Sequence, residues 1–375
     1  MRPAPDPLAA ARSFDLAGEP IEAAPLGNGH IHDTFLVSCT GAPHRDRYVL
    51  QRLNRAVFPD PNLVMTNVAR VLSHLHSKLG PERAEREALT LVPGRDGSLN
   101  VRDEAGETWR AYLFVAGASS HDVPRSPRDA QQAAHAFATF QRLLGDLPDP
   151  PLAETIPDFH DTPARLAALE RAIAADCAYR AAGARNEIDF ALVNADLAEA
   201  LAALHRRGLL ATRVVHNDTK LNNVLLDDST GAAVCVIDLD TVMPGLALHD
   251  FGDLVRSAGG AAAEDEPDYR RHVVVPERFA AIARGFADGL GDELSALERS
   301  SLVLAARVMT FECGLRFLAD HLDGDRYFRA RRPGHNLDRC RTQFALLRSL
   351  TERQDELRDL VESFAVWRPE APHAR

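Results

Sequence analysis

The stretch "HNDTKLNN" occupies residues 216–223, and "VIDLD" follows it at residues 236–240. Together they place three carboxylates, three asparagine amides and one ammonium group around one short loop and the end of the next apolar segment. Residues of these types, taken singly, often form turns or cap helices. Their combination at this spacing calls for a chemical reason.

Phosphoryl transfer supplies such a reason. It needs a carboxylate to orient the proton of the attacking hydroxyl, oxygen ligands for Mg²⁺, and a cation near the transferring group. We therefore predict Asp218 as the base, Asn223 and Asp238 as Mg²⁺ ligands, and Lys220 as a charge on the γ-phosphate of ATP. Mg²⁺ commonly takes one or two protein oxygens plus phosphates and water, so this set is sufficient.

Composition narrows the class of protein. The net charge of −11 argues against a nucleic-acid groove, which would be basic. The N-terminus lacks the apolar core of a secretory signal, and charged residues interrupt the most apolar late segment, so no membrane span is expected. Five scattered cysteines have no zinc-site spacing, which favours a reduced, cytoplasmic protein.

The first part of the chain has the pattern of short strands with one helix. The helix is expected over residues 63–80 and should end at Gly80-Pro81. Alternating or apolar segments bounded by turn residues predict strands at 21–26, 31–39, 47–53, 88–92, 98–103 and 108–115. These segments predict a small antiparallel sheet.

The remainder is mainly helical, with helices expected at 126–145, 162–182 and 188–207 and onward to the C-terminus. Two short strands around a turn at 227–231 interrupt them. We predict an α+β fold with two lobes: an antiparallel-sheet front lobe that binds nucleotide and a larger helical rear lobe that binds substrate. The expected division is a flexible tail at 1–20, the front lobe at 21–116 and the rear lobe at 117–368.

The pattern H-x-D-x-x-x-x-N followed by an aspartate resembles the catalytic loop and metal-binding residue of kinases. Asp238 is followed by Leu239 and Asp240, so the Asp-Phe-Gly motif of protein kinases is absent here. A strand ending I-D-x-D, followed by Asp250 and Asp253 at a helix start, is similar to the aminoglycoside phosphotransferase and choline-kinase-like family. This resemblance implies a bilobal protein-kinase-like fold.

Within that family, the sequence resembles the N-acetylhexosamine 1-kinases over about residues 27–343. The matching stretches are "GNGHIHDTFLV", "YVLQRLN", "ETIPDFHDTPARL", "HNDTKLNNVLLD", "VIDLDTVMPGLALHDFGDLVR" and "DGDRYFRARRPGHNLDRCRTQ". The resemblance implies phosphate transfer from ATP to the anomeric hydroxyl of N-acetylglucosamine or N-acetylgalactosamine. It gives Asp218 as the base, with Asn223 and Asp238 as metal ligands.

The phosphate-binding residues of the front lobe are less clear from the sequence. Gly27, Asn28 and Gly29 form a loop with fewer glycines than G-x-G-x-x-G, so as a nucleotide signal it is weak. In the kinase pattern the third strand carries a lysine, whereas this chain has Gln51 there, with Arg52 beside it. Either Arg52 replaces that lysine from a shifted register, or metal and loop amides hold the phosphates.

On the acceptor side, the segment 302–322 has an apolar helical stripe that predicts a core helix. Glu312 and Arg316 lie on another face, either as a surface ion pair or, for Arg316, as a substrate contact. The resemblance favours substrate roles for Arg316 and Tyr327.

Two front-lobe assignments stay open between a functional and a structural role, and two aspartates of the rear lobe are expected to be structural. His30 and Asp33 could close over the acceptor from the front lobe or serve the hairpin. Asp250 and Asp253 are expected to cap amides and brace the catalytic loop.

Two other functions remain possible. The acceptor could be an aminoglycoside, choline, homoserine or another sugar, and the acidic run "AEDEPD" at 263–268 could attract a polycation, although such a run is usually a solvated loop. A non-catalytic nucleotide-binding module is also conceivable. The missing third-strand lysine favours it slightly, whereas the joint presence of Asp218, Asn223 and Asp238 counts against it.

Overall fold

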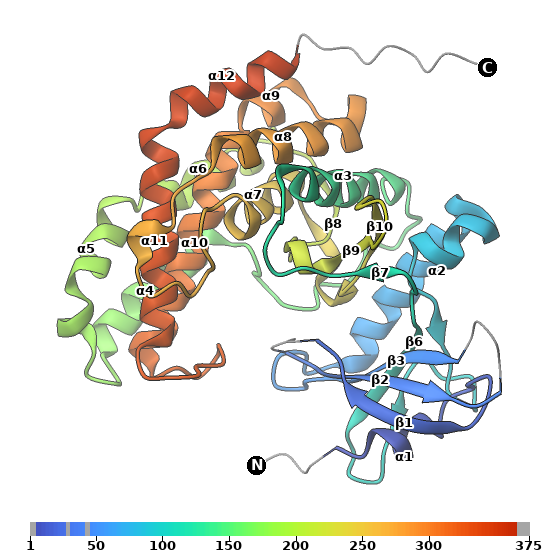
Figure 1. Ribbon diagram of the computed structural model, residues 1–375. Helices are drawn as coiled ribbons and strands as arrows, with labels where there is room; N and C mark the ends of the chain where they lie inside the picture. The colour runs from blue at the N-terminus through green and yellow to red at the C-terminus, as the bar shows by residue number, and fades with distance from the viewer. Residues whose placement is uncertain (1–4, 28–30, 42–45, 366–375) are drawn as a thin grey trace, which may run out of the picture.

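The computed structural model describes residues 5–27, 31–41 and 46–365, and it forms two lobes of different composition (Figure 1). A sheet dominates the front lobe, which comes first in the chain, and helices dominate the rear lobe. None of the helices in the described ranges combines the length and the apolar character that a bilayer crossing requires.

The front lobe is an antiparallel sheet with strand order β1-β2-β3-β6-β4, and β5 also pairs with β6. The register places Thr34 opposite Gln51 and Asp33 opposite Arg52. Because side chains alternate along a strand, Gln51 and Arg52 point to opposite faces of the sheet. The strands are β1 Pro20–Pro25, β2 Asp33–Cys39, β3 Arg47–Arg52, β4 Leu91–Val92, β5 Val101–Arg102 and β6 Thr108–Leu113.

Helix α1, Pro7–Ala11, and Phe14 pack on one face of this sheet, so the described part of the segment expected as a flexible tail is ordered against the front lobe. Helix α1 begins after Asp6, whose carboxylate caps the amide of Ala9. The Phe14 side chain is fully buried with Leu50 and Trp109 in a separate front-lobe core. Burial of a phenylalanine stabilises this arrangement by roughly 1.5–3 kcal/mol.

The long helix α2, Pro61–Glu87, covers the other side of the sheet and joins the core of the rear lobe. Asp60 caps its first turn by accepting from the amides of Asn62 and Leu63. The expected stop at Gly80 is instead a kink: Gly80 has φ 73°, and the helix resumes to Glu87. Glycine permits this left-handed conformation without a steric penalty.

The chain passes from one sheet to the next between residues 114 and 118. The amide of Phe114 still donates to Arg47 of β3, at 3.1 Å. Strand β7, Ala118–Ser119, already pairs with β9, Val224–Asp227, of the rear lobe. An ion pair of 2.5 Å between Arg86 of α2 and Asp227 of β9 adds a second link at this crossing.

The rear lobe is built around α10, Leu302–Asp323, whose apolar stripe is buried as the sequence predicts. Figure 1 shows α11, α7, α6 and α4 around it. Helices α3 and α8 cross closely because α8 carries Gly285, where a Cβ would lie 2.2 Å from the carbonyl oxygen of Gln131. The other helices are α3 Pro127–Leu143, α4 Thr162–Ala175, α5 Arg185–Val193, α6 Leu197–Arg206, α7 Ala247–Ala258, α8 Pro276–Leu290, α9 Ala296–Ser300, α11 His335–Glu352 and α12 Gln354–Ala365.

Helix boundaries differ from expectation in two places. The helix expected over 162–182 ends at Ala175, because Asp176 adopts a left-handed φ of 36°. The helix expected over 188–207 is two helices, α5 and α6, separated at 194–196.

Short strand pairs frame the loops that carry the catalytic motif. The two expected strands are present as β9, Val224–Asp227, and β10, Ala233–Val236. A second pair, β8 Thr212–Val215 with β11 Met243–Leu246, was not expected. These four-residue strands are too short to show a clear alternation in sequence.

Candidate active site

A cleft between the lobes contains two adjoining pockets. The α10 pocket, about 410 Å³, is bounded by α10, by the loop at 325–330 and by front-lobe residues such as Asn54. The β3 pocket, about 420 Å³, is bounded by Gln51 of β3 and by the catalytic motif. The residues that line both pockets are Ile31, Asp218, Lys220, Glu264 and Arg339. Asp218 therefore lies where the two pockets meet.

The catalytic loop is braced by Asp250 in the first turn of α7. Its carboxylate accepts from the amides of His216 (2.9 Å) and Asn217 (2.7 Å) and from the side chain of Gln141 (2.6 Å). Asn217 has a left-handed φ of 64°, which these contacts hold in place. The bracing role expected for Asp250 is confirmed, although Asp250 supports the amides of the loop and not those of its own helix.

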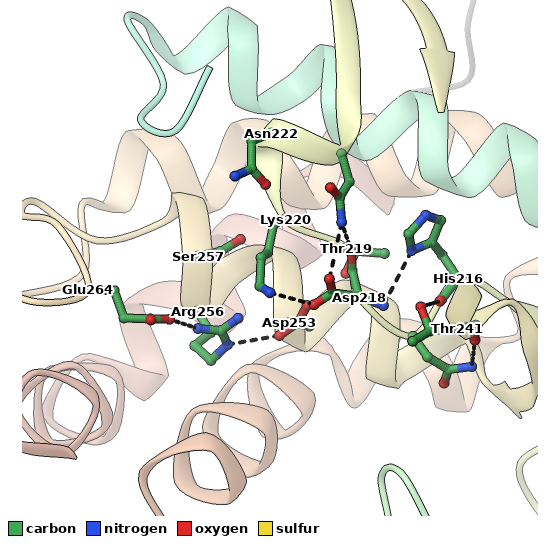
Figure 2. A network of polar contacts seen from close by, with 12 residues as sticks. His216, Asp218, Thr219, Lys220, Asn222, Thr241, Asp253, Arg256, Ser257 and Glu264 are labelled. Atoms are coloured by element: carbon green, nitrogen blue, oxygen red, sulfur yellow. Dashed lines mark hydrogen bonds and ion pairs between the residues drawn. The ribbon is translucent and has the colours of Figure 1, made fainter. Parts of the chain in front are cut away.

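Asp218 follows this turn and lies between two donors (Figure 2). Lys220 Nζ lies 2.8 Å from Oδ1, and Asn223 Nδ2 donates to the Asp218 carbonyl (2.8 Å) and to Oδ2 (3.2 Å). Burial alone would raise the pKa of Asp218, but the Lys220 ammonium lowers that pKa to about 2. The carboxylate is therefore ionised at neutral pH and can accept a hydrogen bond from a hydroxyl.

Asp238 lies two residues after the end of β10 in a left-handed conformation, with φ 61°. The amide of Ile237 donates to the Asn223 carbonyl at 2.9 Å, which ties the strand end to the catalytic loop. Burial raises the pKa of Asp238, as do the neighbouring carboxylates of Asp240 and Asp218. Within the described residues, no protein group donates a hydrogen bond to the Asp238 carboxylate, so a cation would relieve this clustering of negative charge.

Asp240, two residues later, is already satisfied by the front lobe. It accepts from both terminal nitrogens of Arg110 in β6 and from His32 Nε2 at 2.5 Å. His32 Nδ1 accepts from the amide of Asn54 at 3.0 Å, so Nε2 carries the proton. His32, Asp238 and Asp240 bring ligand atoms within 4.8 Å of one another. Because Asp240 is paired in this way, Asp238 is the carboxylate suited to hold a metal.

The sequence contains no local signal for Arg110 or for its pairing with Asp240. Arg110 stands in the middle of a strand, at a position where burial would have predicted an apolar residue. A buried arginine requires a paired carboxylate, but its partner lies 130 residues away along the chain.

His160 lies behind the catalytic loop and contacts it directly. Its Nδ1 lies 2.7 Å from Glu312 Oε1, and its Nε2 lies 2.7 Å from the Asn217 carbonyl. Both partners can only accept, so both ring nitrogens carry protons. Burial would lower the pKa of His160, but Glu312 raises it, and the pKa of Glu312 falls to about 2 despite its own burial. Glu312 is therefore not half of a surface pair with Arg316, which corrects that alternative.

Arg316 projects from α10 into the α10 pocket and is surrounded by aromatic rings. Its guanidinium carbon lies 5.0 Å from the ring centroid of Phe159, 5.9 Å from that of Tyr327 and 5.4 Å from that of Phe328. Asp320 fixes the loop that presents these rings by accepting from the amides of Tyr327 (2.7 Å) and Phe328 (3.0 Å). Tyr327 lines the pocket and is 53 % exposed, so it is accessible to a ligand.

A second ion-pair network lies beside Lys220, as Figure 2 shows. The buried Arg256 guanidinium donates to Asp253 (2.8 Å) and to Glu264 (2.6 Å). Asp253 thus pairs with Arg256 and does not cap its helix, contrary to expectation. Glu264 lies in the acidic run 263–268 yet lines both pockets, so this run is not simply a solvated loop.

Several expected front-lobe contacts lie away from the cleft. Arg52 donates to Asp33 from Nε (2.8 Å) and Nη2 (2.6 Å), on the face of β3 opposite to Gln51. Neither Arg52 nor Asp33 is among the described residues that line the two pockets. The structure therefore does not support a contact of Arg52 with the phosphates or a contact of Asp33 with the acceptor. Gly27 is exposed, with φ 72°, whereas Asn28, Gly29 and His30 lie outside the described residues.

Comparison with known proteins identifies both a sequence family and structures of similar fold. A sequence model described as the phosphotransferase enzyme family matches residues 22–285. The chain is similar to a solved aminoglycoside phosphotransferase from Alicyclobacillus acidocaldarius subsp. acidocaldarius, with 16 % identity, a TM-score of 0.61, and 97 % of this chain and 98 % of that chain covered.

Two other solved structures are similar over most of their length. A choline kinase from Cryptosporidium parvum Iowa II has 14 % identity and a TM-score of 0.58, with 92 % of each chain covered. A spectinomycin phosphotransferase, solved with ADP and spectinomycin, has 11 % identity and a TM-score of 0.51, with 93 % of this chain and 95 % of that chain covered. At such identities the likeness concerns the fold, and it confirms the bilobal, protein-kinase-like α+β architecture.

Proposed function

Since the chain belongs to the phosphotransferase enzyme family, we propose that it transfers the γ-phosphate of ATP to the anomeric hydroxyl of N-acetylglucosamine or N-acetylgalactosamine. The observation that carries this proposal is the position of Asp218. It lines both the α10 pocket and the β3 pocket, so an acceptor hydroxyl in one and a phosphate in the other can meet beside it.

In the proposed reaction, ATP binds in the β3 pocket and the sugar in the α10 pocket. The hydroxyl oxygen attacks the γ-phosphorus, the bond from that phosphorus to the oxygen of ADP breaks, and the hydroxyl proton passes to Asp218. With a pKa of about 2, Asp218 is a weak base. It therefore acts mainly by orienting the hydroxyl, which suits a loose transition state in which the proton leaves late.

Lys220 and a metal ion held by the proposed ligands would neutralise the negative charge of the phosphates. Asn223 and Asp238 offer oxygen ligands beside the β3 pocket, and burial together with the neighbouring carboxylates of Asp240 and Asp218 raises the pKa of Asp238. When bound there, Mg²⁺ would neutralise phosphate charge. Lys220, which lines both pockets, can turn from Asp218 towards the transferring group, because its side chain is 40 % exposed.

The α10 pocket supports a neutral, hydroxyl-rich acceptor over a cationic one. Aromatic faces commonly bind the quaternary ammonium of choline-type ligands. Here the faces of Phe159, Tyr327 and Phe328 already surround the guanidinium of Arg316. The imidazolium of His160 in the same pocket is neutralised by Glu312, which leaves Arg316 as the cation among these groups. Choline or an aminoglycoside would meet like charge, whereas Arg316 and Tyr327 can donate hydrogen bonds to sugar oxygens.

The test is ADP release from ATP–Mg²⁺ with N-acetylglucosamine, N-acetylgalactosamine, glucose, choline and an aminoglycoside. Asp218→Asn serves as the inactive variant and Asp96→Asn, in an exposed front-lobe turn, as the matched control. Turnover confined to the N-acetylhexosamines, with phosphorus NMR showing a 1-phosphate, would support the proposal.

Other outcomes would change the proposed function. Turnover with another acceptor only would discard the sugar assignment while keeping Asp218 as the base. Nucleotide binding without turnover across the panel would favour a non-catalytic binding module. Full activity of Asp218→Asn would refute the base assignment itself.

A further inference from the structure

The third strand of this chain lacks the lysine that commonly holds nucleotide phosphates in kinases. The side chain found there is Gln51, which lines the β3 pocket together with Asn223 and Asp238. A neutral amide can replace a cation at this position only if its donor end faces the phosphates. The orientation of the Gln51 amide therefore decides what it can bind.

Arg110 sets that orientation. Its Nε donates to Gln51 Oε1 at 2.9 Å, and a guanidinium has only donors. The oxygen of the amide must consequently face Arg110, and the amino group must face away from it. Gln51 Nε2 donates one hydrogen to Thr34 Oγ1, at 3.1 Å, and no other acceptor among the described residues takes its second hydrogen, which can serve a ligand in the pocket.

Arg110 is itself fixed from the rear lobe. Its terminal nitrogens donate to both carboxylate oxygens of Asp240, and its side chain is 1 % exposed. Asp240 lies two residues after Asp238, the proposed metal ligand. The chain of contacts thus runs from the metal-binding segment through a buried arginine to the amide of Gln51, and it crosses between the lobes.

We propose that Gln51 is the front-lobe donor to the nucleotide phosphates in place of the third-strand lysine, and that Arg110 is the positioning residue that turns its amide towards them. The proposal rests on the proposed function in so far as the β3 pocket binds ATP. Arg110 is not a ligand of the phosphates, because among the described residues it lines neither pocket.

The experiment compares the affinities of ADP–Mg²⁺ and adenosine by isothermal titration calorimetry, without any acceptor. Gln51→Leu removes the donor, and ADP–Mg²⁺ should bind about tenfold more weakly or worse, as expected for one hydrogen bond to a charged group. Adenosine has no phosphates, so its affinity should stay unchanged.

Gln51→Glu keeps the variant folded while removing the donor, since a carboxylate still accepts from Arg110 Nε. Its ADP–Mg²⁺ affinity should fall further than that of Gln51→Leu, because negative charge then faces the phosphates. Asn62→Asp adds the same charge at an exposed front-lobe position that lines neither pocket, and should bind ADP–Mg²⁺ as the wild type does.

Arg110→Lys tests the positioning role, because a lysine can pair with Asp240 but cannot donate a hydrogen bond to Gln51 at the same time. ADP–Mg²⁺ affinity should fall several-fold with adenosine affinity retained, and adding Gln51→Leu should then weaken binding little more. Fully additive losses would refute positioning by Arg110.

The proposal would be overturned if both Gln51 variants bound ADP–Mg²⁺ as the wild type does, or if they lost adenosine and ADP–Mg²⁺ affinity equally. Failure of the sugar assignment would not affect these binding data. A wild-type protein that bound neither ligand would instead refute the nucleotide function itself.

Discussion

Replacing Arg110 by methionine should destabilise the folded protein strongly. Asp240 is 2 % exposed and lies close to Asp238, with His32 as its only other side-chain partner among the described residues. Methionine fills much of the same volume but leaves the carboxylate without a countercharge. Removal of one partner from a buried ion pair typically costs about 3–5 kcal/mol.

Urea denaturation, followed by fluorescence of the two tryptophans and by circular dichroism, would measure the loss in unfolding free energy. The matched control is Arg83→Met, which breaks the exposed pair between Arg83 and Glu87 on α2. Exposed pairs of this kind contribute about 0.3–0.5 kcal/mol, so the control should be nearly as stable as the wild type.

The double variant Arg110→Met with Asp240→Leu separates pairing from packing. Without the buried carboxylate, the arginine is no longer required for charge balance, and most of the lost stability should return. Equal stability of Arg110→Met and wild type would refute the reasoning. A double variant less stable than either single variant would show that packing, and not charge, dominates at this position.

Three further predictions concern the pH dependence and the two pockets. Burial lowers the pKa of His160 and Glu312 raises it, and the net effect is an increase above 6.5. The stabilisation from the charged imidazole is complete below about pH 6.5 and is lost as the pH rises through the higher folded pKa. Urea titrations at several pH values should therefore show the wild type losing unfolding free energy in that range, while His160→Gln should not. Asp238→Ala should raise the Mg²⁺ concentration needed for half-maximal ADP binding at least tenfold, measured by calorimetry, and an unchanged Mg²⁺ requirement would argue against Asp238 as a metal ligand. Arg316→Met should raise the acceptor KM about tenfold or more while leaving the KM for ATP within twofold, and a selective rise in the ATP value would place Arg316 with the nucleotide instead.

The candidate catalytic motif could be found in the sequence because its spacing is local. Asp218, Lys220 and Asn223 lie on one short loop, so any fold that preserves the loop keeps them together. The division into a sheet and a helical part was equally accessible, since hydrophobic periodicity and turn residues are local signals. Asp218 pairs with Lys220 in the same loop, and Asp250 braces this loop from a helix that follows soon after it in the chain. Both contacts therefore join segments that are close in sequence.

The surroundings of the motif could not be predicted in this way. Arg52 was the natural candidate for a phosphate contact because it is the cation nearest to the missing lysine in sequence. The alternation of β3 turns Arg52 towards Asp33 and turns the neutral Gln51 towards the cleft. A single step along a strand reverses the face of the sheet, so an uncertain register cannot decide this point.

The sequence by itself determined the local features: which residues form the candidate catalytic loop, which strand precedes Asp238, and how the two lobes follow one another. Only the tertiary structure decided the pairing of Arg110 with Asp240, the orientation of the Gln51 amide and the aromatic surroundings of Arg316. The physical reason is distance along the chain. Buried charges and amides take their orientation from partners brought close by folding, and no local pattern records those partners.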